Sequence, residues 1–212
     1  MLTPIAANAP QQDRSRASLE RLMLATREIL SEGTFEQLTI AGISKRSKVS
    51  VGSIYARFKG KDELFLAVMI DVMTEMEGEW AQEIEALKTR KLSLSELVPA
   101  LIDRLAEHLH RHASILKPFM TKASDPRVAA CGKAAHLKTE QTFQELLLEQ
   151  RDSISHPEPE RAVLNSFVIA YSALARFLGL GSAPDAAGEG SWDHLKNDLG
   201  QMCLGFLKQS HA

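Results

Sequence analysis

The stretch that determines the fold runs from Leu38 to Leu64 and reads LTIAGISKRSKVSVGSIYARFKGKDEL. Thr39 is placed to cap a short helix that ends near Lys48, because a threonine side chain accepts hydrogen bonds from the first amides of a helix. Ser50 is placed in the same way before a second short helix over residues 51–58. Two short helices joined by a turn of about three residues predict a helix-turn-helix.

Basic residues are concentrated in the same stretch. Six Lys and Arg residues and no acidic residue lie between Gln37 and Lys61, although the whole chain has a net charge of −2. Residues 1–66 hold ten basic and seven acidic residues, whereas residues 67–212 hold 15 and 20. A short basic run alone is most often a solvated face. Its coincidence with the paired short helices indicates a surface for a polyanion such as DNA.

Amphipathic patterns flank the helix-turn-helix on both sides. Apolar residues at helical spacing predict a first helix over about residues 16–32, which stops at Gly33, and a long helix over residues 61–87. We therefore predict a DNA-binding domain over residues 1–66 and a second helical domain over residues 67–212.

Only helical patterns follow in the rest of the chain. Ser93 and Glu96 form a capping box for a helix that ends near His112, with Pro99 as a kink or a later start. The further predictions are a short piece at 114–120, helices at 126–151, 160–180 and 192–208, and a loop at 179–190 rich in Gly and Ala. No strand periodicity is present, so the predicted fold is all-α, with about nine helices.

Composition excludes several classes of protein. The chain has 212 residues, 44% of them hydrophobic, and only two cysteines, Cys131 and Cys203. This rules out a disulfide scaffold and suggests buried thiols in a reducing compartment. Residues 1–12 carry no Lys or Arg and so lack the start of a secretory signal. Polar residues interrupt the apolar stretch 162–180, which favours a buried helix over a membrane span. A soluble, cytoplasmic protein is expected.

Catalytic and metal-binding motifs are weak. His108, His110 and His112 suggest a metal cluster, but only His108 and His112 share a helical face. Glu107 and His110 match half of a di-iron motif, and no second Glu-x-x-His is present. No nucleophile elbow, P-loop or dinucleotide fingerprint is found. We therefore expect no enzyme activity, no cofactor and no metal, with the histidines at a solvated helix end.

The second short helix carries the side chains expected to read DNA. Ile54 and Phe58 face inward together, so Val51 and Ser53 point toward the base edges, and Gly52 permits a close approach to the groove. These side chains have little hydrogen-bonding reach, so part of the recognition is expected to come from DNA shape. Arg14 and Arg16, ahead of the first helix, either enter the minor groove or belong to a frayed terminus.

The segment resembles the N-terminal signature of the tetracycline-repressor-like (TetR) family of transcriptional regulators. The matching positions are Thr39, Ile43, Val49, Ser50, Gly52, Ile54, Tyr55, Phe58, Lys61 and Leu64. The resemblance covers about residues 16–66. The sequence departs from the family at Ser44 and Ser47, where alanines are usual, and at Lys48, where a turn glycine is common.

The resemblance implies contacts with the DNA backbone. It assigns phosphate binding to Tyr55 and Lys61, with Arg57 as a third contact and Lys48 as an additional cation. Thr39 and Ser50, as helix caps, present backbone amides to phosphates. Such contacts fix the register of the protein on DNA without reading its sequence.

The resemblance also implies a dimer and a ligand cavity in the second domain. The expected cavity residues are aromatic and methionine side chains: Met76, Trp80, Phe119, Met120, Phe143, Phe167 and Tyr171. The expected dimer contacts lie on the last two long helices: Phe167, Ala170, Leu174, Leu195, Leu199, Met202 and Phe206. Plain core packing is the alternative for each residue in both sets.

These expectations describe a homodimeric repressor that binds a palindromic operator and is released by a small molecule. Two recognition helices about 34 Å apart would enter successive major grooves. The alternatives are a helical-bundle metal-binding enzyme or carrier, and a regulator of the same fold that is an activator or needs no ligand.

Overall fold

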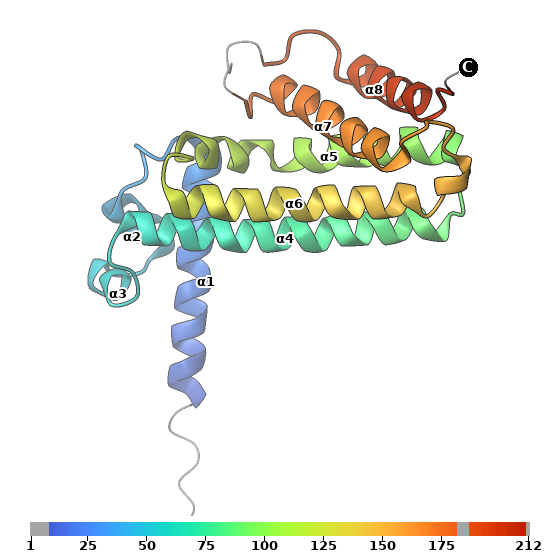
Figure 1. The fold of residues 1–212 in the computed structure, drawn as a ribbon. Coiled ribbons are helices and arrows are strands. Elements are labelled where there is room, and N and C mark those ends of the chain that lie inside the picture. The colour runs from blue at the N-terminus through green and yellow to red at the C-terminus, as the bar shows by residue number, and fades with distance from the viewer. Residues whose placement is uncertain (1–8, 182–186, 211–212) are drawn as a thin grey trace, which may run out of the picture.

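The protein is a bundle of helices with a small three-helix unit at one end (Figure 1). The computed structural model describes residues 9–181 and 187–210, with side chains from residue 13 onward. The α-helices in these ranges are α1 (Ala9–Glu32), α2 (Ile40–Ser47), α3 (Val51–Tyr55), α4 (Lys61–Thr89), α5 (Leu94–Thr121), α6 (Pro126–Leu148), α7 (Pro159–Phe177) and α8 (Trp192–Leu207). A 3₁₀ turn, η1, covers Arg151–Ser153. The all-α prediction is confirmed, with eight α-helices and this turn in the described residues.

Helices α1, α2 and α3 share one apolar core. Leu22, Leu30, Leu38, Ile43 and Ile54 are completely buried there. One face of α2 packs against α1, and α3 packs against α2.

The first helix is longer than its apolar pattern predicts. Arg14 and Arg16 lie inside α1 rather than ahead of it, so the expectation of a frayed segment there is wrong. Arg16 donates a hydrogen bond to Glu20 at 3.0 Å, an (i, i+4) pair that supports an exposed helical turn.

Helix α5 is continuous where two pieces are predicted. Ser93 and Glu96 form the predicted capping box, and the helix runs through both Pro99 and Pro118 to Thr121. Pro118 and Phe119 are buried, so the apolar face continues past residue 112. Core packing there outweighs the hydrogen bond that each proline removes from the helix.

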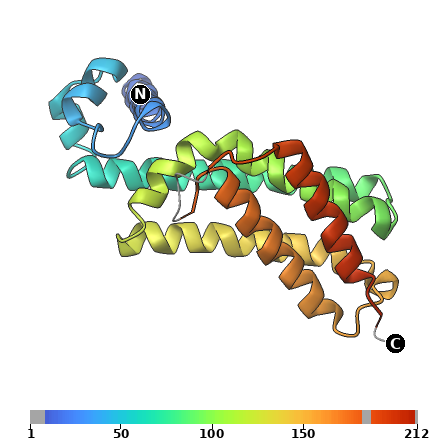
Figure 2. The same ribbon diagram turned by 90° about the horizontal axis from the view of Figure 1, so that it is seen from above.

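Helices α7 and α8 lie side by side across the bundle, as Figures 1 and 2 show. Helix α8 also packs on α5, where a Cβ added at Gly200 would lie 3.1 Å from the Pro99 Cα. The described parts of the predicted loop, 179–181 and 187–190, contain no helix, and residues 182–186 lie outside the described ranges. Cys203 is buried and Cys131 partly buried, both as free thiols, and burial raises the pKa of each.

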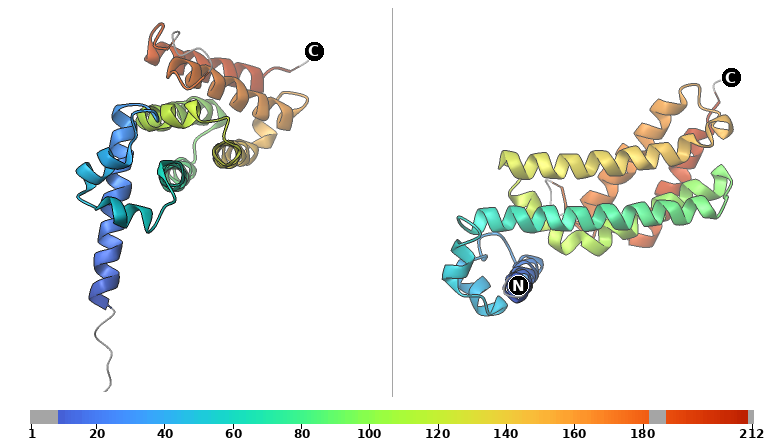
Figure 3. Two further views of the ribbon diagram at one scale, coloured as in Figure 1. Left: turned by 90° about the vertical axis from the view of Figure 1, so that its left-hand side faces the viewer. Right: turned by 90° about the horizontal axis from the view of Figure 1, so that it is seen from below.

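The three-helix unit joins the bundle through a series of aromatic rings. Phe35 meets Phe65 edge to face at 4.9 Å between centroids, and Phe65 meets Phe119 at 5.3 Å. The Nζ atoms of Lys61 and Lys122 lie 4.2 and 4.1 Å from the Phe35 ring centre. Figure 3 shows the same junction, where α1 passes the start of α4 and the end of α5.

Candidate nucleic-acid interface and ligand cavity

Both predicted caps are present at the helix-turn-helix. The Thr39 hydroxyl accepts a hydrogen bond from the Gly42 amide at 3.1 Å, and the Ser50 hydroxyl accepts one from the Ser53 amide at 3.2 Å. Each cap fixes the first turn of its helix and satisfies one amide. The two hydroxyls thus fix the positions at which α2 and α3 begin.

The turn itself depends on the residues that depart from the family pattern. Lys48 is left-handed, with φ 58° and ψ 27°, a conformation that glycine adopts more easily. Ser44 donates to the Val49 carbonyl at 2.7 Å, and the Val49 amide donates to the Ser47 hydroxyl at 3.2 Å. Ser47 is buried, so its hydroxyl is satisfied inside the motif. The two serines hold the turn around Lys48.

The outer face of α3 is exposed and the inner face is buried. Val51 is 42% exposed and Tyr55 is 55% exposed, whereas Ile54 is completely buried. Gly52 is exposed, and a Cβ added there would meet no atom within 4 Å. The fold therefore does not require glycine at this position. Ser53 is half-buried, and its hydroxyl lies 2.9 Å from that of Ser50.

The basic side chains of the motif differ in their surroundings. Lys48 is exposed beside the start of α3. Arg57 donates to the Ser53 carbonyl at 3.2 Å and to the Ser15 hydroxyl at 3.1 Å, which links the end of α3 to α1. Lys61 donates to the Phe35 carbonyl at 3.3 Å. Arg57 and Lys61 are therefore positioned by the fold before any DNA arrives.

Fold and site together define a helix-turn-helix DNA-binding protein. Residues 22–68 match the sequence model of the bacterial regulatory proteins, tetR family. This part of the chain is therefore similar to the DNA-binding segment of TetR-family transcriptional regulators.

Comparison with whole proteins extends the similarity beyond the DNA-binding unit. The HTH-type transcriptional regulator UidR of Escherichia coli is 23% identical over 184 residues, which are 85% of this chain and 90% of that protein. A TetR-family regulator from Mesorhizobium loti has a TM-score of 0.72 at 15% identity, over 92% of this chain and 96% of that chain. FadR from Bacillus subtilis in complex with stearoyl-CoA has a TM-score of 0.66 at 14% identity, over 89% and 98%. Salmonella enterica GusR has a TM-score of 0.61 at 16% identity, over 91% and 96%.

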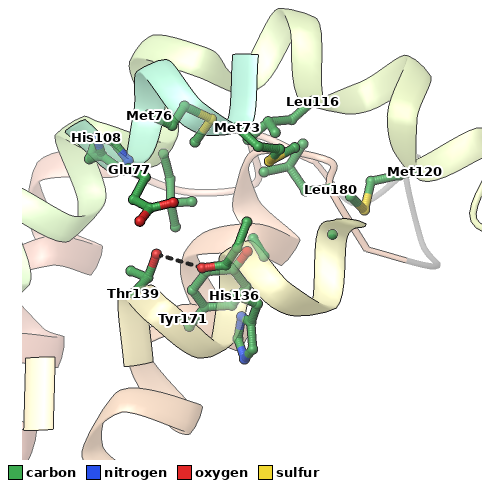
Figure 4. A pocket seen from close by; sticks show the side chains of 14 residues that line it. Met73, Met76, Glu77, His108, Leu116, Met120, His136, Thr139, Tyr171 and Leu180 are labelled. Carbon is green, nitrogen blue, oxygen red and sulfur yellow. Dashed lines mark hydrogen bonds between the residues drawn. The ribbon is translucent and has the colours of Figure 1, made fainter. Parts of the chain in front are cut away.

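A cavity of about 120 Å³ lies among α4, α5, α6 and α7 (Figure 4). Met76, Met120 and Tyr171, three of the seven predicted cavity residues, line it. The sequence did not identify the other lining residues as part of a cavity; they are Met73, Glu77, His108, Leu109, Leu116, Gly132, Ala135, His136, Thr139, Ala175 and Leu180. The polar lining residues lie on amphipathic helices. Which of these residues meet in one cavity depends on how the four helices pack, and the sequence alone does not show this.

The remaining predicted cavity residues lie elsewhere. Phe119, Phe143 and Phe167 are completely buried in the apolar core, and Trp80 donates to the Thr142 hydroxyl at 2.6 Å outside this cavity. The rings of the three phenylalanines fill the space between helices, so core packing is their observed role, whereas Trp80 lines a different pocket, between α4 and α6.

The three histidines of α5 do not form a solvated helix end, because the helix continues past them. His108 and His112 are 2% and 4% exposed, and only His110 is exposed. Burial, and to a lesser extent the charge of the neighbouring His112, lower the pKa of His108 to about 4. His112 pairs with Glu79 at 2.8 Å.

The half di-iron motif has a different role. Glu107 accepts hydrogen bonds from Lys196 at 2.6 Å and from the Trp192 indole at 3.0 Å. The hydrogen bond from Lys196 is the main reason that the pKa of Glu107 lies below its usual value. Glu107 therefore holds α8 against α5.

Most predicted dimer residues are buried within one protomer. Phe167, Ala170 and Leu174 are completely buried and Leu199 nearly so, while Leu195 and Phe206 are partly buried. Helix α7 packs on α5, α6 and α8, and α8 packs on α5 and α7, so most of these side chains are covered within the chain. Met202 on α8 is 63% exposed, and on α7 Val168 is 45% and Ile169 is 53% exposed.

None of the helices in the described ranges combines the length and the apolar character needed to cross a membrane.

Proposed function

We propose that the protein is a homodimeric repressor that binds a palindromic operator and is released by a small molecule. Residues 1–66 bind DNA, and residues 67–212 bind the ligand and form the dimer. The observation that carries the proposal is the exposed face of α3, held by two caps and a buried Ile54.

The helix-turn-helix supplies two kinds of contact. Val51 and Ser53 lie at the start of α3, where side chains of a recognition helix meet base edges, and Gly52 lets the backbone come close. Tyr55, Arg57, Lys61 and Lys48 contact phosphates, with Thr39 and Ser50 presenting the helix amides. Since Val51 is apolar, its contacts favour thymine methyl groups.

The cavity among α4 to α7 is the proposed ligand site. Its wall is mainly methionine and aliphatic side chains, with Glu77, His136, Thr139 and Tyr171 as polar groups. Such a surface suits a mostly apolar ligand with a few hydrogen-bonding groups. FadR of Bacillus subtilis, which shares the fold, was crystallised in complex with stearoyl-CoA, which supports a small-molecule ligand for this chain.

The proposed dimer face consists of the exposed apolar residues Val168, Ile169 and Met202 on α7 and α8. Met202 is one of the dimer residues that the sequence suggested, and Val168 and Ile169 lie on the same helix as three others. Pairing these faces around a twofold axis would give a four-helix interface and two DNA-binding units.

The phosphate contacts are tested with a Tyr55→Phe, Lys61→Ala double variant. DNA affinity should fall for every sequence, and the slope of log affinity against log salt should decrease by about 2 per dimer, about one for each lysine. Lys133→Ala, an exposed lysine on α6, is the control and should change neither quantity. An unchanged affinity and slope in the double variant would refute these contacts.

A further inference from the structure

Three side chains of the kinds that ligate metals meet between α4 and α5. Glu79 comes from α4, and His108 and His112 lie four residues apart on α5. One ligand atom from each side chain lies within 4.8 Å of the other two. The two imidazole rings are 5.3 Å apart between centroids, because residues at i and i+4 share a helix face.

A second observation concerns His108 alone. Its side chain is 2% exposed, and its Nδ1 atom has no hydrogen-bond partner among the described residues. Buried polar atoms are nearly always paired, and an unpaired one costs about 1–3 kcal/mol. An unpaired nitrogen beside a second imidazole and a carboxylate is an indication of a missing ligand.

We propose that Glu79, His108 and His112 bind one divalent first-row transition-metal ion of the Zn²⁺ class. Imidazole and carboxylate together suit such ions, which protein sites commonly hold through three side chains with one position left open. Neutral imidazole is the form that ligates such ions. The ion joins α4 to α5, and His108 places it at the wall of the cavity.

Arg111 is the local charge that opposes the ion. Its Nη1 atom lies 2.9 Å from Glu79, on the oxygen that also pairs with His112. Arg111 reaches Glu83 as well, at 3.4 Å, so it keeps an acidic partner when the ion takes Glu79. Removing the positive charge of Arg111 should therefore strengthen metal binding.

The test is a Zn²⁺ titration of the full chain, freed of metal, against a chromophoric chelator. The protein should bind one Zn²⁺ per chain, and Glu79→Gln and His108→Leu should each weaken this binding at least about 100-fold. His110→Asn, on the same helix but outside the cluster, is the matched control and should leave the affinity unchanged. His108→Leu also removes the unpaired nitrogen, so without metal its melting temperature should equal or exceed that of the original protein.

Two further measurements guard against binding elsewhere. Co²⁺ should give visible d–d absorption in the original protein and in His110→Asn, and none in His108→Leu. Arg111→Gln should bind Zn²⁺ several-fold more tightly, a gain that a purely structural Glu79–Arg111 pair would not produce. Absence of saturable Zn²⁺ binding, or equal affinity in His108→Leu and the original protein, would overturn the proposal. Neither result depends on DNA binding or on the proposed ligand.

Discussion

At the scale of single residues, the helix-turn-helix separates what the fold needs from what DNA needs. Lys48 adopts a left-handed backbone that glycine would adopt at lower cost. Gly52 occupies a helical position where an added Cβ would meet no atom of the protein within 4 Å. Lys48 and Gly52 thus each lower the stability of the fold. A role in binding DNA explains why each is present.

Lys48→Gly should therefore raise stability and lower DNA affinity. Relief of the left-handed backbone should add up to about 1 kcal/mol to the free energy of unfolding. Loss of the cation should weaken DNA binding and decrease its salt dependence. Urea denaturation and a DNA titration at several salt concentrations check both changes. A variant that is less stable, or that binds DNA as before, would contradict this account of Lys48.

Gly52→Ala should also raise stability and lower DNA affinity, here because the side chain is larger and not because a charge is lost. Alanine in place of an exposed helical glycine should add about 0.5–1 kcal/mol of stability. The added methyl group should hold α3 away from the groove and weaken operator binding by about tenfold, or about 1.4 kcal/mol. Gly78→Ala, at an exposed glycine on α4 with open space around it, should gain similar stability and keep its DNA affinity.

At the scale of helices, close approach and ion pairing fix α8 on α5. Gly200 faces the backbone of Pro99, where the proline has already removed one helical amide. Glu107, Trp192 and Lys196 form a polar group at the other end of the same contact. The position of α8, and of the proposed dimer face, depends on both.

Gly200→Val should destabilise the protein by about 1–3 kcal/mol, because the new side chain must displace the Pro99 backbone. Gly78→Val is the matched control, since its position is open, and should lie within about 0.5 kcal/mol of the original protein. Thermal unfolding of both variants measures the difference. Equal losses would mean that the approach of α8 to α5 is looser than described.

Glu107→Gln should show how the stability contributed by the contact between α8 and α5 depends on pH. The pKa of Glu107 is lower in the folded protein than its ordinary 4.5, mainly through Lys196, so the folded state favours the ionised form. That stability is present above about pH 5 and is lost as the pH falls through the folded pKa. At pH 7 the variant should be less stable by about 0.5–1 kcal/mol, since the pair is partly exposed. In urea denaturation the difference should shrink by pH 3.5; a constant difference would contradict the assignment.

The sequence predicted the helices well and their faces less well. Caps, glycine stops and apolar spacing identified α2 to α4, because these signals are local. The break placed after His112 was wrong, since the buried Pro118 and Phe119 continue α5 through packing that local signals do not carry. Cavity residues such as Glu77 and His136 come from separate helices, so their meeting depends on tertiary structure.

At the scale of the whole molecule, the proposed activity requires two chains. One chain presents one α3, and a palindromic operator needs two of them at a fixed separation. Val168, Ile169 and Met202 form the exposed apolar face that would set this separation. DNA affinity and oligomeric state should therefore change together.

Ile169→Glu should give a monomer and reduce operator affinity strongly, because a carboxylate would be buried without a partner in the dimer. Leu137→Glu, at an apolar position of similar exposure on α6, should remain dimeric and bind normally. Sedimentation velocity and a DNA titration on the same samples measure both properties. A dimeric Ile169→Glu variant would move the interface to another surface.

The aromatic series between the two parts of the chain has a mechanical consequence. Met120 lines the cavity, and the next residue inward, Phe119, touches Phe65, which touches Phe35 beneath Lys61. Close-packed rings have little room to deform. A ligand in the cavity that shifts the last turn of α5 would therefore move Phe119, Phe65 and Phe35 together. Such a movement would turn the whole three-helix unit relative to the bundle, while the hydrogen bonds within that unit stay intact.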